Sequence, residues 1–187
     1  TTAPRFSIRK AGVKILYLPD YVTSGSMTGE QADALRFAIH AKRNILIIGG
    51  TGSGKTTLAN ALLAEVANLG DRVLILEDTR ELRCSASDVV ALRTSNHVPM
   101  SALVRSSLRL RPDRIIIGEV RGPEALDLLK AWNTGHPGGI ATVHANGALE
   151  GLSRMEQLIL EAIPTVPSGL ITEAIDVLVF INGKGKA

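Results

Sequence analysis

Residues 44–57 read Asn-Ile-Leu-Ile-Ile-Gly-Gly-Thr-Gly-Ser-Gly-Lys-Thr-Thr, and this stretch decides the fold. Four apolar residues lead into Gly49–Thr56, which has the spacing Gly-x-x-x-x-Gly-Lys-Thr. Glycines allow successive backbone N–H groups to turn toward one anion, and the positive end of a following helix adds to the attraction. The stretch therefore predicts a phosphate-binding loop between a buried strand and a helix.

The loop predicts a nucleoside triphosphate and Mg²⁺ as ligands. Lys55 is expected to reach the β- and γ-phosphates, and the Thr56 hydroxyl to bind the metal. The predicted nucleotide-binding residues are Gly50, Thr51, Gly52, Ser53, Gly54, Lys55, Thr56 and Thr57. We expect ATP, although no guanine-reading motif is present to separate ATP from GTP by sequence.

Short apolar segments alternate with helical patterns on both sides of the loop. The expected strands are 44–48, 72–76, 114–118, 139–143 and 176–181, and the expected helices are 55–69, 101–110, 123–132 and 149–162. A capping-box spacing from Thr28 to Gln31 predicts an earlier helix that buries Ala34, Leu35, Ala38 and Ile39. The alternation predicts an α/β fold, a mainly parallel sheet with helices on both faces.

The first residues read differently from this core. Residues 5–18 alternate as short strands or an extended arm that Pro19 ends, and 23–26 (Thr-Ser-Gly-Ser) is flexible in composition. The first residue is Thr, so the chain reads as a fragment of a longer protein. We expect residues 1–27 to be the end of an N-terminal domain and a linker, and 28–187 to be the nucleotide-binding domain.

Composition narrows the function classes. The 187 residues carry a formal charge of +3, and only 3% are aromatic, which argues against strong direct binding of nucleic acid. Cys84 is the single cysteine, so the sequence offers neither a disulfide framework nor a cysteine-based metal cluster. No apolar run reaches the roughly 18 residues that a membrane span needs.

Polar side chains follow the expected strands, where parallel sheets place their ligands. Glu77 follows the second strand, Glu119 the third, and His144 the fourth. Both glutamates compete for the roles of holding metal and activating water, and Gly118 occupies the place where many enzymes with this loop have the magnesium aspartate. We expect Glu119 to activate the water and Glu77 to bind the metal through a water molecule, with Lys55 and His144 completing the catalytic set.

Several arginines could stabilise charge on the transferred phosphoryl group. Arg80 and Arg121 come just after the acidic strand ends, and Arg9 lies in the N-terminal arm. Arg105, Arg109 and Arg111 lie on an expected helix and its exit. The sequence leaves the choice among them open.

Four ordered blocks together resemble the secretion or traffic ATPases. They are Gly-Gly-Thr-Gly-Ser-Gly-Lys-Thr-Thr (49–57), Leu-Glu-Asp-Thr-Arg-Glu-Leu (76–82), Arg-Pro-Asp-Arg-Ile-Ile-Ile-Gly-Glu-Val-Arg-Gly (111–122) and Gly-His-Pro-Gly-Gly-Ile-Ala-Thr-Val-His-Ala-Asn (135–146). They correspond to that family's Walker A, Asp box, Walker B and His box. The sequence of the blocks is most similar to the conjugal-transfer ATPases of the type IV secretion branch, and the match runs from about Arg5 to Ile181.

The resemblance implies a RecA-like P-loop domain that forms a homo-hexamer on the cytoplasmic side of the bacterial inner membrane. In the family, ATP hydrolysis drives assembly of a secretion apparatus or handling of its substrates, beside other proteins of that apparatus. The family's Asp-box glutamate, Walker-B glutamate and His-box histidine correspond to Glu77, Glu119 and His144, and Arg9 matches the end of an N-terminal domain whose arginines reach the γ-phosphate.

Other functions remain open at this point. A type II secretion or pilus-retraction motor shares all four blocks. A RecA-like DNA helicase or translocase would share the fold, but the scarcity of aromatic residues argues against it. A nucleotide switch that scarcely hydrolyses ATP would not need two carboxylates at the phosphate end, and a small-molecule kinase would need a lid that the short connections do not offer.

Overall fold

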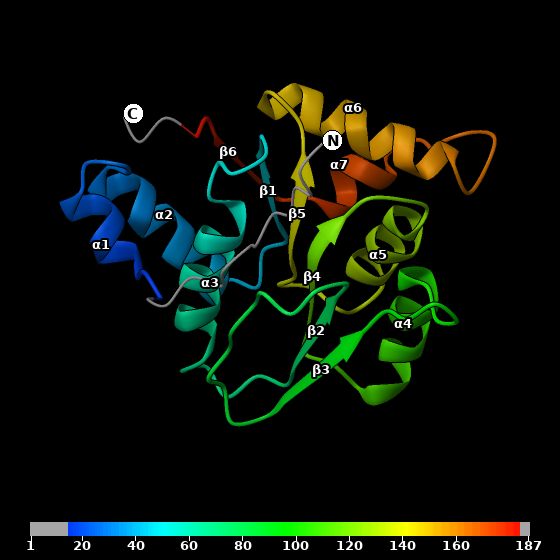
Figure 1. Ribbon diagram of the computed structural model, residues 1–187, viewed down its shortest axis with the longest axis horizontal. Helices are drawn as coiled ribbons and strands as arrows, with labels where there is room; N and C mark the ends of the chain where they lie inside the picture. The colour runs from blue at the N-terminus through cyan, green and yellow to red at the C-terminus, as the bar shows by residue number, and fades with distance from the viewer. Residues whose placement is uncertain (1–14, 184–187) are drawn as a thin grey trace, which may run out of the picture.

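A six-stranded, entirely parallel sheet forms the centre of the computed structural model, which describes residues 15–183 (Figure 1). Its strands are β1 (Ile45–Gly49), β2 (Val73–Glu77), β3 (Val89–Arg93), β4 (Arg114–Val120), β5 (Ile140–His144) and β6 (Val177–Ile181). They lie in the order β3-β2-β4-β5-β1-β6, with β1 paired to β5 and β6. The carboxyl ends of β1, β2, β4 and β5 therefore share one edge of the sheet.

Helices cover both faces of the sheet, as the sequence predicts (Figure 1). On one face lie α1 (Leu18–Thr23), α2 (Gly29–His40) and α3 (Lys55–Val66). On the other lie α4 (Met100–Ser107), α5 (Glu124–Asn133), α6 (Ala148–Leu160) and α7 (Leu170–Ala174). Strands β1, β2 and β4 between these layers are almost entirely buried, which explains their nearly unbroken runs of Ile, Leu and Val.

Three short elements were absent from the sequence prediction: α1, β3 and α7. Strand β3 is only partly buried at the edge of the sheet, and no helix separates it from β2. Parallel strands are usually connected through a helix, but the 78–88 connection contains none. The sequence pattern therefore did not indicate this strand. The helix predicted to end at Leu110 stops at Ser107 and continues as a single 3₁₀ turn, η1 (Leu108–Leu110).

The start of α2 confirms the predicted capping box. The Gln31 N–H donates to the Thr28 hydroxyl, and the Thr28 N–H donates to the Gln31 side chain. One part of the predicted buried stripe is wrong, because Ala34 is exposed and Ala32 is buried instead. Ala32 lies three residues before Leu35 and seven before Ile39, so these three share one face of the helix.

The predicted arm at residues 5–14, including Arg9, lies outside the described residues. Helix α1, within the predicted linker, packs Leu18 into the same core as α2 and α3, and Pro19 stands in its first turn rather than ending an extended segment. The division at residues 27 and 28 stays a prediction. Between residues 15 and 183, no helix combines the length and apolar character needed to cross a membrane.

A buried arginine links three segments of the chain at the edge of the sheet opposite the phosphate loop. Arg114, 1% exposed, donates to Asp71 (2.7 Å) and to the carbonyls of Ile39 (2.9 Å) and Gly138 (3.1 Å). Lys42 also contacts Asp71, at 2.9 Å. Burial alone would raise the pKa of Asp71, but hydrogen bonds and charge from Arg114 and Lys42 outweigh burial and lower that pKa below its ordinary value of 3.8.

Replacing Arg114 with methionine should lower the free energy of unfolding by about 3–5 kcal/mol, because the change removes a buried charged partner from the Asp71 carboxylate, which keeps only Lys42, and a donor from two buried carbonyls. Urea unfolding measures this, and Arg105→Ala, which breaks an exposed ion pair with Asp127, should cost no more than about 1 kcal/mol. The pair stabilises the fold above pH 3.8 and loses this effect as the pH falls through the lower folded pKa of Asp71. An Arg114→Met deficit that stayed constant into strong acid would contradict this assignment.

Candidate functional site

The phosphate loop has the backbone geometry that anion binding requires. It leaves β1 at Gly49, passes through Gly52 (φ +71°) and Gly54 (φ +100°), and enters α3 at Lys55. Both glycines are in the left-handed region, which side chains disfavour. Gly54 is the N-cap of α3 and has no side chain to occupy the first-turn N–H groups. The loop and the helix end can therefore both point donors at one anion.

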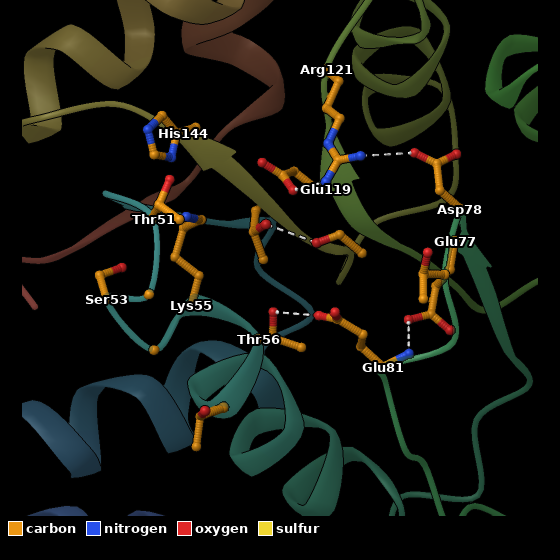
Figure 2. A pocket seen from close by; sticks show the side chains of 16 residues that line it. Thr51, Ser53, Lys55, Thr56, Glu77, Asp78, Glu81, Glu119, Arg121 and His144 are labelled. Carbon is orange, nitrogen blue, oxygen red and sulfur yellow. Dashed lines mark hydrogen bonds and ion pairs between the residues drawn. The ribbon is translucent and has the colours of Figure 1, made fainter. Parts of the chain in front are cut away.

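Around this loop is a cavity of about 410 Å³ at the carboxyl edge of the sheet (Figure 2). Seven of the eight predicted nucleotide-binding residues line it, namely Thr51 to Thr57, and Gly50 does not. The predicted catalytic residues Glu77, Glu119 and His144 line it as well. Side chains from four separate strand ends thus meet at one cavity, as the strand-end argument predicted.

Lys55 folds back onto its own loop. Its ammonium group donates to the carbonyl oxygens of Gly49 (2.8 Å) and Gly50 (3.0 Å). These contacts hold the side chain along the loop, within the cavity, where a bound triphosphate would offer it anionic oxygens. The geometry fits the predicted role of Lys55.

Glu77 is nearly buried, 3% exposed, and one carboxylate oxygen accepts the N–H groups of Glu81 (3.0 Å) and Leu82 (2.7 Å). Burial raises the pKa of Glu77 above its ordinary value, and these two donors oppose that rise in part. A Cβ atom on Gly118 would lie 3.2 Å from the Glu77 Cγ atom. Glu77 on β2 therefore lies beside Gly118, and a side chain at position 118 would be in tight contact with it.

Glu81 is a cavity residue that sequence reasoning missed. The Thr56 hydroxyl, the predicted magnesium ligand, donates to the Glu81 carboxylate at 3.3 Å (Figure 2). Its position in the sequence could have indicated it, because Glu81 lies inside the 76–82 block, four residues after Glu77. The structure thus adds a second carboxylate, beside Glu77, to the part of the cavity where the predicted metal ligand Thr56 lies.

The donor set suits magnesium. Among residues 15–183, no group of three or more His, Cys, Asp or Glu side chains could hold a metal ion by itself. Magnesium does not need such a cage, because it binds one or two protein oxygens and takes the rest from phosphates and water. The Thr56 hydroxyl with the Glu81 carboxylate, and Glu77 behind them, matches this preference for hard oxygen ligands.

Glu119 stands at an irregularity in β4. The register between β4 and β5 shifts between Ile117 and Val120, so Gly118 and Glu119 have no regular ladder partners. The Thr142 hydroxyl donates to the Gly118 carbonyl at 2.7 Å and satisfies it instead. Bulges of this kind redirect a side chain next to a site, and Glu119 accordingly lines the cavity.

Of the candidate arginines in the described chain, Arg121 is the one that lines the cavity. It donates to the Glu119 carboxylate at 2.7 Å and to Asp78 at 3.4 Å. Arg80, Arg109 and Arg111 are exposed outside the cavity lining, and Arg105 pairs with Asp127. Among residues 15–183, Arg121 is therefore the candidate arginine that lies at the cavity, and the choice of the arginine that acts on the phosphoryl group stays a prediction.

His144 is the exposed last residue of β5, and its Cα is in register with Gly49 of β1. Figure 2 shows its ring near Thr51, on the loop side of the cavity. An imidazole at this position can donate a hydrogen bond toward a phosphate held by the loop. Its place in the catalytic set stays a prediction.

The chain is similar to known proteins over nearly its whole length. Residues 2–181 match the family model described as type II/IV secretion system protein. The chain is 54% identical over 187 residues to the conjugal transfer protein TrbB of Rhizobium radiobacter, covering 99% of this chain and 58% of that protein. It is 38% identical over 179 residues to the type IV secretion system protein PtlH of Bordetella pertussis, covering 88% of this chain and 52% of that protein.

A solved structure confirms the fold. The chain superimposes on the VirB11 ATPase of the Brucella suis type IV secretion system, in complex with sulphate, with a TM-score of 0.77 at 29% identity. The superposition covers 96% of this chain and 58% of that one. The predicted RecA-like P-loop fold and the resemblance to conjugal-transfer proteins are both confirmed. The chain spans a little more than half the length of these relatives.

Proposed function

The chain belongs to the type II/IV secretion system protein family, and on that premise we propose that it is a magnesium-dependent ATPase domain of a conjugation or type IV secretion motor. One observation carries the proposal. A phosphate-binding loop, two metal-side carboxylates and a separate carboxylate on β4 line one cavity. A protein that only binds nucleotide would need the loop but not the carboxylates.

The proposed reaction divides among these residues. Backbone N–H groups of the loop and Lys55 hold the β- and γ-phosphates. Glu119 accepts a proton from water as the water oxygen bonds to the γ-phosphorus. The bond from that phosphorus to the β–γ bridging oxygen breaks, and ADP and inorganic phosphate leave.

Thr56, Glu81 and Glu77 are the residues proposed to hold magnesium. When bound, the metal would neutralise negative charge on the phosphate oxygens. Thr56 would supply a direct oxygen ligand, while the carboxylates of Glu81 and Glu77 would orient its water molecules. Glu77 offers only its second oxygen for this, since the first accepts two backbone N–H groups.

The wider role is proposed from the relatives. TrbB is named as a conjugal transfer protein and PtlH as a type IV secretion system protein, and these branches fit the chain better than pilus retraction. We propose a homo-hexamer at the cytoplasmic side of the inner membrane, acting with other proteins of the apparatus. In such a ring Arg9, outside the described residues, is the proposed source of an arginine that reaches the γ-phosphate.

Phosphate release from ATP by the full-length protein tests this proposal. We expect hydrolysis with Mg²⁺ and a loss of at least about 10²-fold when EDTA removes the metal, because the metal supplies several kcal/mol of charge stabilisation. Adding excess Mg²⁺ should restore the rate, which controls for damage by EDTA. Sedimentation with ATP should show assembly.

Two outcomes would contradict the proposal. Hydrolysis that is unaffected by EDTA would contradict the proposed role of the metal in the reaction. A protein that stays strictly monomeric at high concentration with ATP would contradict the proposed hexameric motor. A rate that rises strongly only when DNA is added would favour a DNA translocase instead.

A further inference from the structure

Arg121 joins two carboxylates from different strands at the rim of the cavity. One terminal nitrogen donates to Glu119 at 2.7 Å, and the other donates to Asp78 at 3.4 Å (Figure 2). Glu119 is on β4 and Asp78 directly follows β2, so the guanidinium bridges neighbouring strand ends. The planar fork of arginine suits such a bridge, because its terminal nitrogens present donors in fixed directions, whereas the donors of an ammonium group are not fixed in this way.

Both ends of this bridge are themselves fixed. The N–H groups of Arg121 and Gly122 donate to the buried Glu124 carboxylate at 2.7 and 2.9 Å, which sets the turn that carries Arg121. On the other side, the Thr94 hydroxyl donates to Asp78 at 2.8 Å, and the Thr94 N–H donates to the Glu77 carbonyl. A chain of polar contacts therefore runs from the turn before α5, through Arg121, to the loops after β2 and β3.

Glu119 needs such a support. It lies at the bulge of β4, where regular sheet pairing is interrupted, and its side chain is 29% exposed. A carboxylate that rotates freely there would spend little time aligned with an attacking water. Arg121 occupies one carboxylate oxygen, Oε2, and leaves the other for that water.

We propose that Arg121 is a positioning residue that holds Glu119 for water activation, and that Asp78 is the second anchor that holds Arg121 in place. The inference rests on the proposed ATPase function. It differs from the role of a phosphate-contacting arginine, because the contacts that the structure gives the two terminal nitrogens of Arg121 are to carboxylates. A phosphate contact would act on nucleotide affinity, whereas positioning of Glu119 acts on turnover.

The expected signature is a change in kcat without a change in KM. Arg121→Ala in the full-length protein should lower kcat by about 10-fold, since small misplacements of a reacting group have effects of this order or greater. KM for ATP should stay within about twofold. Arg121→Lys should recover part of kcat, and Asp78→Asn should lower it by a smaller factor while keeping an oxygen for the Thr94 hydroxyl.

A double variant tests whether the two residues act as one unit. Arg121→Ala combined with Asp78→Asn should have the kcat of Arg121→Ala alone, because Asp78 acts only through Arg121. Independent roles would instead multiply the two losses. Multiplied losses would overturn the assignment of Asp78 as the second anchor.

Arg43→Ala is the matched control. Arg43 and Asp176 form an ion pair at 2.9 Å with side chains 55% and 28% exposed, against 60% and 29% for Arg121 and Glu119. This pair lies away from the cavity, so its loss should leave kcat unchanged. If wild type and Arg43→Ala hydrolyse ATP but Arg121→Ala keeps full kcat, or weakens ATP binding instead, the inference fails. If wild type itself does not hydrolyse ATP, the proposed function fails.

Discussion

Replacing Lys55 with alanine is expected to lower ATP hydrolysis by about 10²-fold or more, the largest loss for a single loop residue, since it removes a positive charge aimed at the transferred phosphate. In the structure its ammonium lies against the Gly49 and Gly50 carbonyls, inside the cavity. The same charge faces the β- and γ-phosphates in the ground state, so ATP affinity should fall as well. Loss of both kcat and affinity separates Lys55 from a residue that acts only on the reacting water.

Titration with a fluorescent ATP analogue and a phosphate-release assay measure the two effects separately. Lys130→Ala, an exposed lysine on α5, is the control for loss of one positive charge and should leave both unchanged. The unfolding midpoint of Lys55→Ala should stay close to that of wild type, because the side chain is not part of the core. Unchanged affinity and turnover in a folded Lys55→Ala variant would contradict the phosphate-loop assignment.

Polar side chains that line the cavity contact other groups of the protein. Lys55 binds loop carbonyls, Thr56 donates to Glu81, and Arg121 bridges Glu119 and Asp78. A nucleotide with its metal must replace the first two contacts, because phosphate and metal need those same atoms. On our proposal the third contact persists with nucleotide bound, so Arg121 keeps Glu119 in place on the β4 side of the cavity.

The sequence was sufficient to predict which edge of the sheet carries the candidate site and most of the residues that line it. Parallel strands end at one edge, so Glu77, Glu119 and His144 were expected near the loop from their order along the chain alone. The structure brings all three to the cavity. This part was predictable because strand polarity and alternation are local patterns.

The remaining features depend on contacts between distant segments. Glu81 reaches Thr56 only because Glu77 accepts two backbone N–H groups and curls the loop after β2. The bulge at Gly118 follows from register with β5, and strand β3 pairs with β2 without an intervening helix. Neither residue spacing nor hydrophobic periodicity contains these long-range pairings.

Replacing Glu119 with glutamine should lower kcat by about 10²–10³-fold while ATP binding is retained, because the amide cannot accept the proton of the attacking water. The amide oxygen can still accept the hydrogen bond from Arg121, so the shape of the site is kept. Glu77→Gln should act differently. Its amide oxygen can still accept the Glu81 and Leu82 N–H groups, and its main effect should be a higher Mg²⁺ concentration for half-maximal rate.

Rates measured against Mg²⁺ concentration, at saturating ATP, distinguish the two glutamates. Glu119→Gln should lower the plateau without moving the midpoint, and Glu77→Gln should move the midpoint more than the plateau. Glu156→Gln, on the exposed side of α6, is the control and should do neither. If Glu119→Gln kept normal hydrolysis while Glu77→Gln abolished both hydrolysis and magnesium dependence, the roles would be exchanged.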